Sequence, residues 1–364
     1  MTETEKSSSR VIAWLQNAVQ QGASDLHLVA NHPPMLRLHG RLLALDEQAL
    51  TPTDLSTELP ALCPPETYRD FECNKNIDFA FQLEIAERPH RFRANFFFSG
   101  DVIGGCIRII PEAIPSFEWT SFPREVANRL TGFQNGLVVV AGVTGAGKTT
   151  TLAMLINLLN QAGGYRIITI EEPIEYIFPQ TADSLVTQRQ VGTDVATFAD
   201  GLKYGLRQDP DVILVSEIRD RETAQMALSA ADTGHLVVTT LHSRDAKGTI
   251  SRLCDLFPQS GQTEIRAQLA MSLRAVVNQH LLPDVNEGES RHLAIELLYN
   301  TPPVGSAIRF GKIETIDNSI VTGRSNGMIT LDESLKQLLN QGKISSETAG
   351  QFATDQRFLD RSRK

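Results

Sequence analysis

The alternation of hydrophobic and polar residues over positions 1–112 predicts a small α+β domain. Apolar residues recur at helical spacing from Val11 to Val19, and an alternating strand pattern follows over 24–28. The stretch from 35 to 45 is typical of a hairpin that turns at His39-Gly40. The other elements that we expect in this domain are a helix after Thr51-Pro52 and strands over 77–83, 91–98 and 102–110.

The pattern changes beyond a proline-marked stretch, 113–135, that we interpret as a linker. Apolar runs then alternate with helical stretches, at 137–141, 167–170, 212–215 and 236–241. Because such strands are buried on both faces, residues 136–364 are predicted to form an α/β domain with a mostly parallel sheet. Toward its end we expect a helix over 264–282, a strand over 292–299, a helix over 331–339 and a frayed terminus over 355–364.

Composition narrows the function classes. The 364 residues leave room for two domains, and 41% hydrophobic with 21% charged residues is an ordinary soluble balance. No run approaches the roughly 18 apolar residues of a membrane span, and residues 1–10 do not look like a secretory signal, so we expect a cytoplasmic protein. Four cysteines without a C-x-x-C pair indicate buried free thiols rather than zinc ligands or disulfides. The net charge of -9 disfavours a nucleic-acid partner.

A phosphate-binding loop is the most informative motif. The residues at 142–149, GVTGAGKT, fit the pattern G-x-x-x-x-G-K-[ST] between an apolar run and a helix-like stretch. Backbone N–H groups of such a loop surround a phosphate chain, Lys148 reaches the terminal phosphates, and the Thr149 hydroxyl holds Mg²⁺. The predicted nucleotide contacts are Gly142, Thr144, Gly145, Ala146, Gly147, Lys148, Thr149 and Thr150.

Two acidic clusters follow predicted parallel strands. Glu217 lies just after 212–215, while Glu171, Glu172 and Glu175 come directly after 167–170. Ligands of parallel sheets bind at the carboxyl ends of the strands, so both clusters are expected beside the phosphate loop. We assign Glu171 as the water-polarising base and Glu217 as a magnesium or water ligand, and these roles could be exchanged.

His235 and His242 flank the predicted strand 236–241. They lie at its opposite ends and therefore cannot share one metal ion. Each is either a hydrogen-bonded structural residue or a group that reports the phosphate state.

Several of these segments resemble motifs of the secretion ATPases. The segments that resemble the Asp box, Walker B and His box are 170–175, 206–215, 217–220, 233–235 and 240–242. Within that superfamily the chain is most similar to the type IV pilus retraction ATPases of twitching motility. Further matches at 22–28, 33–35, 91–93 and 108–111 extend the resemblance over nearly the whole chain.

The resemblance implies an arrangement and a set of partners. It implies a homo-oligomer, a hexameric ring, in which ATP lies between an N-terminal PAS-like domain and a C-terminal RecA-like domain. Arg93, Arg108 and Arg252 match arginines that approach the γ-phosphate, where an arginine contributes about 10³ to 10⁵ in rate. The implied partner is an inner-membrane pilus platform protein, with membrane contact made only through partners.

Three departures from the family pattern leave alternatives open. Glu172 stands where the Asp box usually has Asp, and Ser216 replaces the Gly before the Walker B Glu. The retraction signature Ala-Ile-Arg-Asn-Leu-Ile-Arg-Glu begins at Ala307 but continues after Arg309 as Phe-Gly-Lys. The alternatives are a type II secretion or pilus assembly ATPase, which commonly has a tetracysteine zinc insert and a longer N-terminal region, and an ATP-binding regulatory ring subunit without efficient turnover.

Overall fold

The computed structural model describes residues 9–38, 40–111, 113–286 and 290–355. Its contacts divide the chain into two compact units, Met1–Ala113 and Ile114–Lys364. None of the helices in the described ranges is long and apolar enough to cross a membrane.

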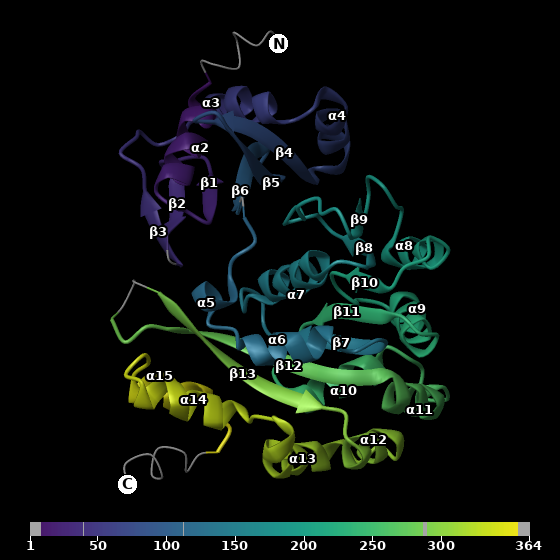
Figure 1. The fold of residues 1–364 in the computed structure, drawn as a ribbon. Helices are drawn as coiled ribbons and strands as arrows, with labels where there is room; N and C mark the ends of the chain where they lie inside the picture. The colour runs from purple at the N-terminus through teal and green to yellow at the C-terminus, as the bar shows by residue number, and fades with distance from the viewer. Residues whose placement is uncertain (1–8, 39, 112, 287–289, 356–364) are drawn as a thin grey trace. The chain divides into compact units, whose positions relative to one another are not determined.

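The first unit is built on a six-stranded antiparallel sheet with the order β3-β2-β1-β6-β5-β4 (Figure 1). Its strands are β1 (Asp25–Leu28), β2 (Met35–Leu38), β3 (Arg41–Ala44), β4 (Asn76–Ile85), β5 (Arg88–Ser99) and β6 (Val102–Ile110). Its helices are α2 (Arg10–Gln20), α3 (Pro52–Glu58), η1 (Leu59–Leu62) and α4 (Pro65–Asn74). Trp14, Leu26, Phe71, Phe92 and Phe96 are among its buried core residues.

Local sequence explains two of these elements. Thr51 accepts a hydrogen bond from the backbone of Asp54 and its own backbone is bonded in return, which is a capping box, so α3 begins at the predicted place. Along β5, Phe92, Ala94 and Phe96 are buried in the core. Alternation therefore places Arg93 on the opposite face of the sheet.

The second unit is built on a seven-stranded sheet with the order β13-β12-β7-β11-β10-β8-β9 (Figure 1). Its strands are β7 (Gly136–Ala141), β8 (Arg166–Glu171), β9 (Leu185–Gln190), β10 (Val212–Val215), β11 (Leu236–Leu241), β12 (Leu273–Pro283) and β13 (Arg291–Tyr299). All neighbours pair in parallel except β12 with β13. The predicted α/β fold class with a mostly parallel sheet is confirmed.

Helices cover this sheet. They are α5 (Phe117–Thr120), α6 (Arg124–Thr131), α7 (Lys148–Ala162), α8 (Phe198–Gly205), α9 (Arg221–Asp232), α10 (Ala246–Asp255), α11 (Gln262–Ser272), α12 (Pro302–Arg309), η2 (Ile313–Thr315), α13 (Ile316–Thr322), η3 (Gly323–Asn326), α14 (Leu331–Asn340) and α15 (Ser346–Phe352). Strands β7, β10 and β11 are buried at every position, as their apolar sequences require.

Three expectations need correction or refinement. The helix expected over 264–282 ends at Ser272, and the rest of that stretch is β12, which pairs with the strand before the phosphate loop. Both faces of β12 are buried, so its sequence shows no strand alternation.

The stretch 113–135, expected to be a linker, contains α5 and α6, whose Phe117 and Leu130 belong to the core of the second unit. All four cysteines are free, but only Cys63 and Cys254 are buried, whereas Cys106 is half-buried and Cys73 is exposed. Of the stretch 355–364, which we expect to fray, all but Asp355 lies outside the described residues.

Candidate active site

The carboxyl ends of four neighbouring parallel strands bring most of the predicted chemistry to one edge of the sheet. The strand order there is β7-β11-β10-β8, and the register pairs Ala141 of β7 with Leu241 of β11. The phosphate loop follows β7, His242 follows β11, Glu217 lies just after β10, and Glu171 ends β8. Parallel strands therefore collect the loop, a histidine and two acids at this edge, as the sequence predicts.

The phosphate loop has backbone angles that require glycine. Gly142, Gly145 and Gly147 have φ values of 149°, 80° and 84°. A Cβ atom at Gly142 would lie 2.6 Å from the carbonyl oxygen of Gln279, so the loop packs closely against β12. Gly147 is the N-cap of α7, and the N–H groups of a helix N-terminus favour an anion.

The predicted nucleotide contacts occupy different environments. Thr144 and Gly145 are exposed on the loop, whereas Ala146 is buried behind it. Thr149 is half-buried in the first turn of α7. The Thr150 hydroxyl lies 3.1 Å from the hydroxyl of Tyr176, so this side chain already has a polar partner within the chain.

Lys148 is a nearly enclosed cation. Only 8% of the residue is exposed, and its ammonium donates to the carbonyl oxygens of Gly142 at 2.9 Å and Val143 at 3.0 Å. Burial lowers the pKa of Lys148, while the negative charges of Glu217 and Glu175 act in the opposite direction. The ammonium is thus held inside the loop, and its charge interacts with acids that follow the neighbouring strands β10 and β8.

A chain of polar contacts runs from Lys148 to the Asp-box segment. His242 lies with Nδ1 3.4 Å from the Lys148 ammonium and Nε2 3.3 Å from Oε1 of Glu217. The other oxygen of Glu217, Oε2, accepts from Nε of Arg219 at 3.0 Å. Nη1 of Arg219 then donates to Glu172 at 2.6 Å. Glu172, which stands where the Asp box usually has Asp, is therefore a partner of Arg219 in this chain.

The contacts of His242 identify its tautomer. An ammonium has only donors, so Nδ1 of His242 accepts, and Nε2 carries the proton that faces Glu217. Burial lowers the pKa of His242, and the positive charges of Lys148 and Arg252 lower it further against the opposing charge of Glu217. A neutral imidazole thus links the loop cation to Glu217.

Glu171 is enclosed rather than open at the sheet edge. It is 5% exposed, and Oε1 accepts from the Thr169 hydroxyl at 2.6 Å and from Nε2 of Gln188 at 3.0 Å. Burial raises the pKa of this carboxyl despite those hydrogen bonds. The sequence identified this acid but not Thr169 and Gln188, because Gln188 comes from β9, a strand with no clear apolar pattern.

The structure places the other two predicted site residues of the second unit, Arg252 and His235, far apart in the fold. Arg252 is exposed on α10 and is near enough to His242 to influence its pKa. His235 precedes β11 and therefore lies at the opposite edge of the sheet from the phosphate loop. Its Nδ1 lies 3.0 Å from the carbonyl oxygen of Ala230, beside a cavity of about 360 Å³ that Tyr165 also lines.

Arg93 and Arg108 lie in the first unit as direct neighbours across β5 and β6. Arg108 pairs through Nε with Oδ1 of Asp25 at 2.9 Å, and Arg93 pairs with Asp78 at 3.4 Å. Directly opposite residues share a face of the sheet, so two positive charges lie side by side there. Their mutual repulsion is unfavourable unless an anion lies nearby.

Comparison with known proteins identifies the family of the chain. A profile described as "Type II/IV secretion system protein" matches residues 108–343. The chain belongs to this family. It is 39% identical over 336 residues, 92% of this chain and 96% of the relative, to the "Type IV pilus retractation ATPase PilT" of Pseudomonas aeruginosa. It is 36% identical over 339 residues, 93% of this chain and 89% of the relative, to a "Twitching motility protein" of Neisseria gonorrhoeae.

Solved structures of secretion-family proteins share the fold. The pilus retraction motor PilT with bound ADP has a TM-score of 0.84 and 38% identity, covering 95% of this chain and 98% of that one. The ATPase DotB of Legionella pneumophila has a TM-score of 0.82 and 26% identity, covering 94% of this chain and 95% of that one. The predicted family is therefore confirmed.

The side chains around the phosphate loop suit a Mg²⁺ ion that is bound together with a nucleotide. They do not suit a metal ion that is held by protein ligands alone. Within the described residues, no group of three or more His, Cys, Asp or Glu side chains could hold a metal ion. Mg²⁺ usually takes one or two protein oxygens and completes its shell with substrate phosphates and water. The hydroxyl of Thr149 supplies a protein oxygen of the required kind next to the loop.

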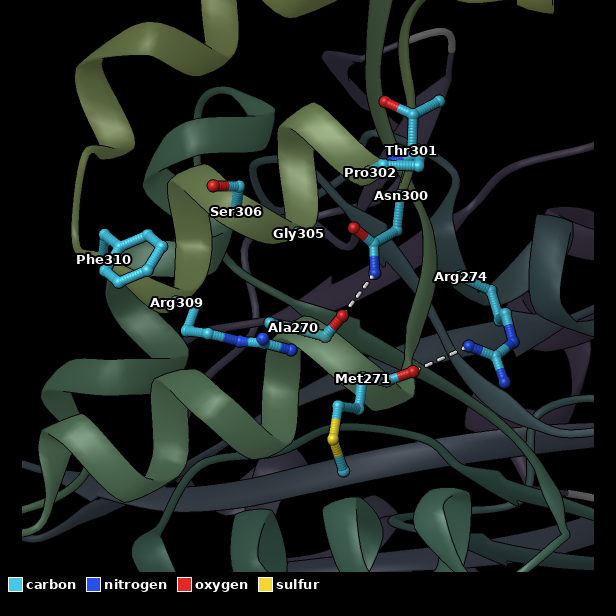
Figure 2. Close-up of a pocket in the computed structure, with 10 residues that line it drawn as sticks. All are labelled: Ala270, Met271, Arg274, Asn300, Thr301, Pro302, Gly305, Ser306, Arg309 and Phe310. Atoms are coloured by element: carbon cyan, nitrogen blue, oxygen red, sulfur yellow. Dashed lines mark hydrogen bonds between the residues drawn. The ribbon is translucent and has the colours of Figure 1, made fainter.

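Two departures from the family pattern, Ser216 and the altered signature after Arg309, can be located in the structure. Ser216 is not among the residues with positive φ, so a side chain is tolerated there, and its carbonyl oxygen accepts from the Thr240 hydroxyl at 2.6 Å. Helix α12 ends at Arg309, within the shortened signature, and Phe310 is 71% exposed. Both residues line a cavity of about 450 Å³ between α11 and α12, which does not include the phosphate loop (Figure 2).

Proposed function

We propose that this protein is an ATP-hydrolysing motor that powers type IV pilus retraction as a homo-oligomeric ring. The observation that carries the proposal is the contact chain from Lys148 through His242 and Glu217 to Arg219, built at the edge of a phosphate-loop sheet. The retraction ATPase PilT is similar over 92% of this chain, and a PilT structure contains ADP. ATP is therefore the proposed substrate.

The phosphate loop binds the substrate. Backbone N–H groups of the loop and the N-terminus of α7 surround the phosphates, and the Lys148 ammonium exchanges its bonds to Gly142 and Val143 for phosphate oxygens. Mg²⁺, held by Thr149 and the phosphates, would neutralise charge on the phosphate oxygens. Burying the Lys148 charge costs free energy, and an anion bound in the loop offsets this cost.

Glu217 orients the attacking water. Its two oxygens are fixed by His242 and Arg219, which holds the carboxylate at the carboxyl end of β10. We therefore assign Glu217 to water, with any contact to Mg²⁺ made through water, and His242 to sensing the phosphate beside Lys148. Glu171 remains the second candidate for the base, because its raised pKa suits proton acceptance while its burial restricts access to water.

Arg93, Arg108 and Arg252 are proposed to stabilise charge on the γ-phosphate. An arginine that reaches the transition state contributes about 10³ to 10⁵ in rate. The first two belong to the first unit, and catalysis that needs them would couple turnover to closure between units. That closure is the proposed source of force on a pilus platform protein at the inner membrane, which this motor would contact from the cytoplasm.

The test combines binding and turnover on the full chain. Lys148→Ala is expected to weaken binding of a fluorescent ATP analogue and to abolish steady-state hydrolysis, while the parent protein binds and hydrolyses. Deleting the gene should leave piliated cells that no longer retract pili, measured by twitching zones.

Two other outcomes would identify the alternatives. Loss of pili, rather than loss of retraction, would indicate a pilus assembly or type II secretion ATPase. Binding of ATP by the parent without measurable hydrolysis would indicate a regulatory ring subunit. The second alternative gains some support from the altered sequence after Arg309, at the end of α12.

A further inference from the structure

A row of charged residues crosses the outer face of the first sheet. The register places Arg37 of β2 opposite Asp25 of β1, Asp25 opposite Arg108 of β6, and Arg108 opposite Arg93 of β5. Directly paired residues of antiparallel strands share a face, so one carboxylate lies within a row of three arginines. The neighbouring residues Leu26, Leu36 and Ile107 belong to the core on the other face.

Asp25 is almost fully enclosed within this row. Its side chain is 7% exposed, whereas that of Asp78, the acid beside Arg93, is 58% exposed. Oδ1 of Asp25 accepts from Nε of Arg108 at 2.9 Å, and Oδ2 accepts from the Ser24 hydroxyl at 2.8 Å. Both carboxylate oxygens are therefore fixed.

The pairing is selective. Arg37 is as close to Asp25 in register as Arg108 is, yet Nη1 of Arg37 donates to the carbonyl oxygen of Gly40 in its own hairpin at 2.9 Å. The ion pair of Asp25 is made with Arg108. It uses Nε, the guanidinium nitrogen nearest the stem, and takes one of the five donors of that group.

We infer that Asp25 is a positioning residue that holds the Arg108 guanidinium in the orientation in which it meets the terminal phosphate of ATP. The inference rests on the proposed function, because it needs Arg108 to act on that phosphate. A contact at Nε fixes the plane of the guanidinium, and a preset arginine loses less conformational freedom when charge develops on the phosphate.

Stability alone gives a weaker account of Asp25. Burying an ion pair is often no more stabilising than apolar side chains of similar volume. Strands β1 and β6 also pair through Leu26, His27 and Leu28, so the backbone contact between them extends beyond this ion pair. Asp25 is enclosed beside Arg108, and Ser24 fixes its second oxygen. This arrangement is better explained if Asp25 sets the orientation of the Arg108 guanidinium.

The test measures hydrolysis and binding by the full-length protein with Asp25→Asn, which preserves shape and removes charge. We expect kcat to fall about tenfold or more while the affinity for a non-hydrolysable ATP analogue stays within about threefold, because the contact matters mainly in the transition state. Asp78→Asn is the matched control and should keep kcat within about twofold, since exposed ion pairs contribute little. Equal losses in both variants would overturn the inference.

A double-mutant comparison separates positioning from structure. If Asp25 acts through Arg108, adding Asp25→Asn to Arg108→Ala should cause no further loss of kcat. Additive losses would overturn the inference. If Arg108→Ala alone hydrolyses ATP at the parent rate, the proposed role of Arg108 fails. If Arg108→Ala is inactive while Asp25→Asn is fully active, only the role of Asp25 fails.

Ser24→Ala covers the case in which Asp25→Asn does not fold. It leaves the charge of Asp25 in place and removes the hydrogen bond to Oδ2. We expect a fall in kcat of about two- to fivefold without a change in analogue affinity, in the range of the net contribution of one lost hydrogen bond. An unchanged kcat in this folded variant would contradict the positioning role.

Discussion

Nδ1 of His242 lies 3.4 Å from the ammonium of Lys148. The ammonium must donate, so the imidazole next to the phosphate loop is neutral and directs its proton toward Glu217. Protonating Nδ1 would place a second positive charge beside Lys148 and break this contact.

The first prediction is a loss of turnover at low pH caused by His242. Burial and Lys148 lower the pKa of His242 below the ordinary 6.5, so the imidazole stays neutral at pH 7 to 8 and becomes charged only as the pH falls through the lowered value. We expect hydrolysis to be level above pH 7 and to decline on the acid side. His242→Asn should remove this acid limb from the pH profile and reduce kcat by about 10².

His235→Ala is the matched comparison for that variant. Because His235 lies at the other edge of the sheet and its Nδ1 contacts the carbonyl oxygen of Ala230, we expect its alanine variant to keep the acid limb of the pH profile and to lose far less kcat than His242→Asn. Loss of the acid limb and of about 10² in kcat in both variants would contradict the separation of the two histidines.

The second prediction concerns Glu217. Glu217→Gln should retain nucleotide binding and lose turnover by about 10² or more, because an amide in its place cannot accept a proton or attract the water as strongly. Glu172→Gln, which changes the other partner of Arg219, is the control and should keep kcat within a few-fold. If Glu171→Gln alone abolished turnover and Glu217→Gln did not, the two acids would exchange roles.

The third prediction is that Ser216 does not impair the motor. Its backbone conformation does not require glycine, and its backbone N–H bonds to the carbonyl oxygen of Ile170 at 2.9 Å. Ser216→Gly should change kcat by less than about threefold and lower the stability by about 0.5 to 1 kcal/mol, through the entropy of the unfolded chain. A large gain in kcat would instead identify Ser216 as a restraint on hydrolysis.

The fourth prediction is a pH-dependent stability caused by Glu296. This carboxyl on β13 is 8% exposed, accepts from the backbone N–H of Ala246 at 2.6 Å, and has a pKa raised by burial to about 7. The folded state thus keeps its proton where the unfolded state, with a pKa near 4.5, has lost it. Stability should decrease as the pH rises from about 4.5 to 7, by an amount on the order of 3 kcal/mol, and then level off.

Glu296→Gln separates this effect from other titrations. The amide keeps an oxygen that accepts from Ala246 but does not ionise, so the variant should be more stable than the parent at pH 8 and similar to it at pH 5. Urea unfolding at the two pH values measures both differences. A variant that is less stable at pH 8 would show that the carboxylate is favoured in the folded protein.

The fifth prediction is a ring that tightens with nucleotide. The arginines of the first unit that are proposed to act on ATP would have to reach it across a boundary between units or subunits, and closed symmetric rings are a common solution for such contacts. Light scattering with a non-hydrolysable analogue should give the mass of six chains. A monomer at micromolar concentration with and without the analogue would contradict it.

Much of the fold could be predicted because its strands have simple sequences. Strands β10 and β11 coincide with their apolar runs, and β6 coincides with the predicted strand 102–110. Strand β12 was missed because burial on both faces removes alternation, which leaves a run that also fits a helix. Strand β9 was missed because this edge strand has mostly polar residues.

The candidate site also combines features that the sequence predicts with features that it does not. The loop, Glu217 and His242 were predictable because each lies next to a recognisable strand. The bridge by Arg219 and the enclosure of Glu171 were not, because they depend on how side chains from separate strands turn toward each other. The cavity beside Arg309 likewise arises from the packing of α12 against α11, which no motif describes.

The position of β12 also has a consequence for how the protein is made. Strand β7, which leads into the phosphate loop, pairs with Leu273 of β12 through Leu137, so its partner on that side is synthesised 136 residues later (273 − 137). At about 5 to 20 residues per second, ribosomes need roughly 7 to 27 s to reach it. During that interval the apolar edge of β7 has no strand beside it, and an unpaired edge invites association with other chains. The nascent polypeptide is therefore prone to associate with other chains through this edge until Leu273–Pro283 has been synthesised.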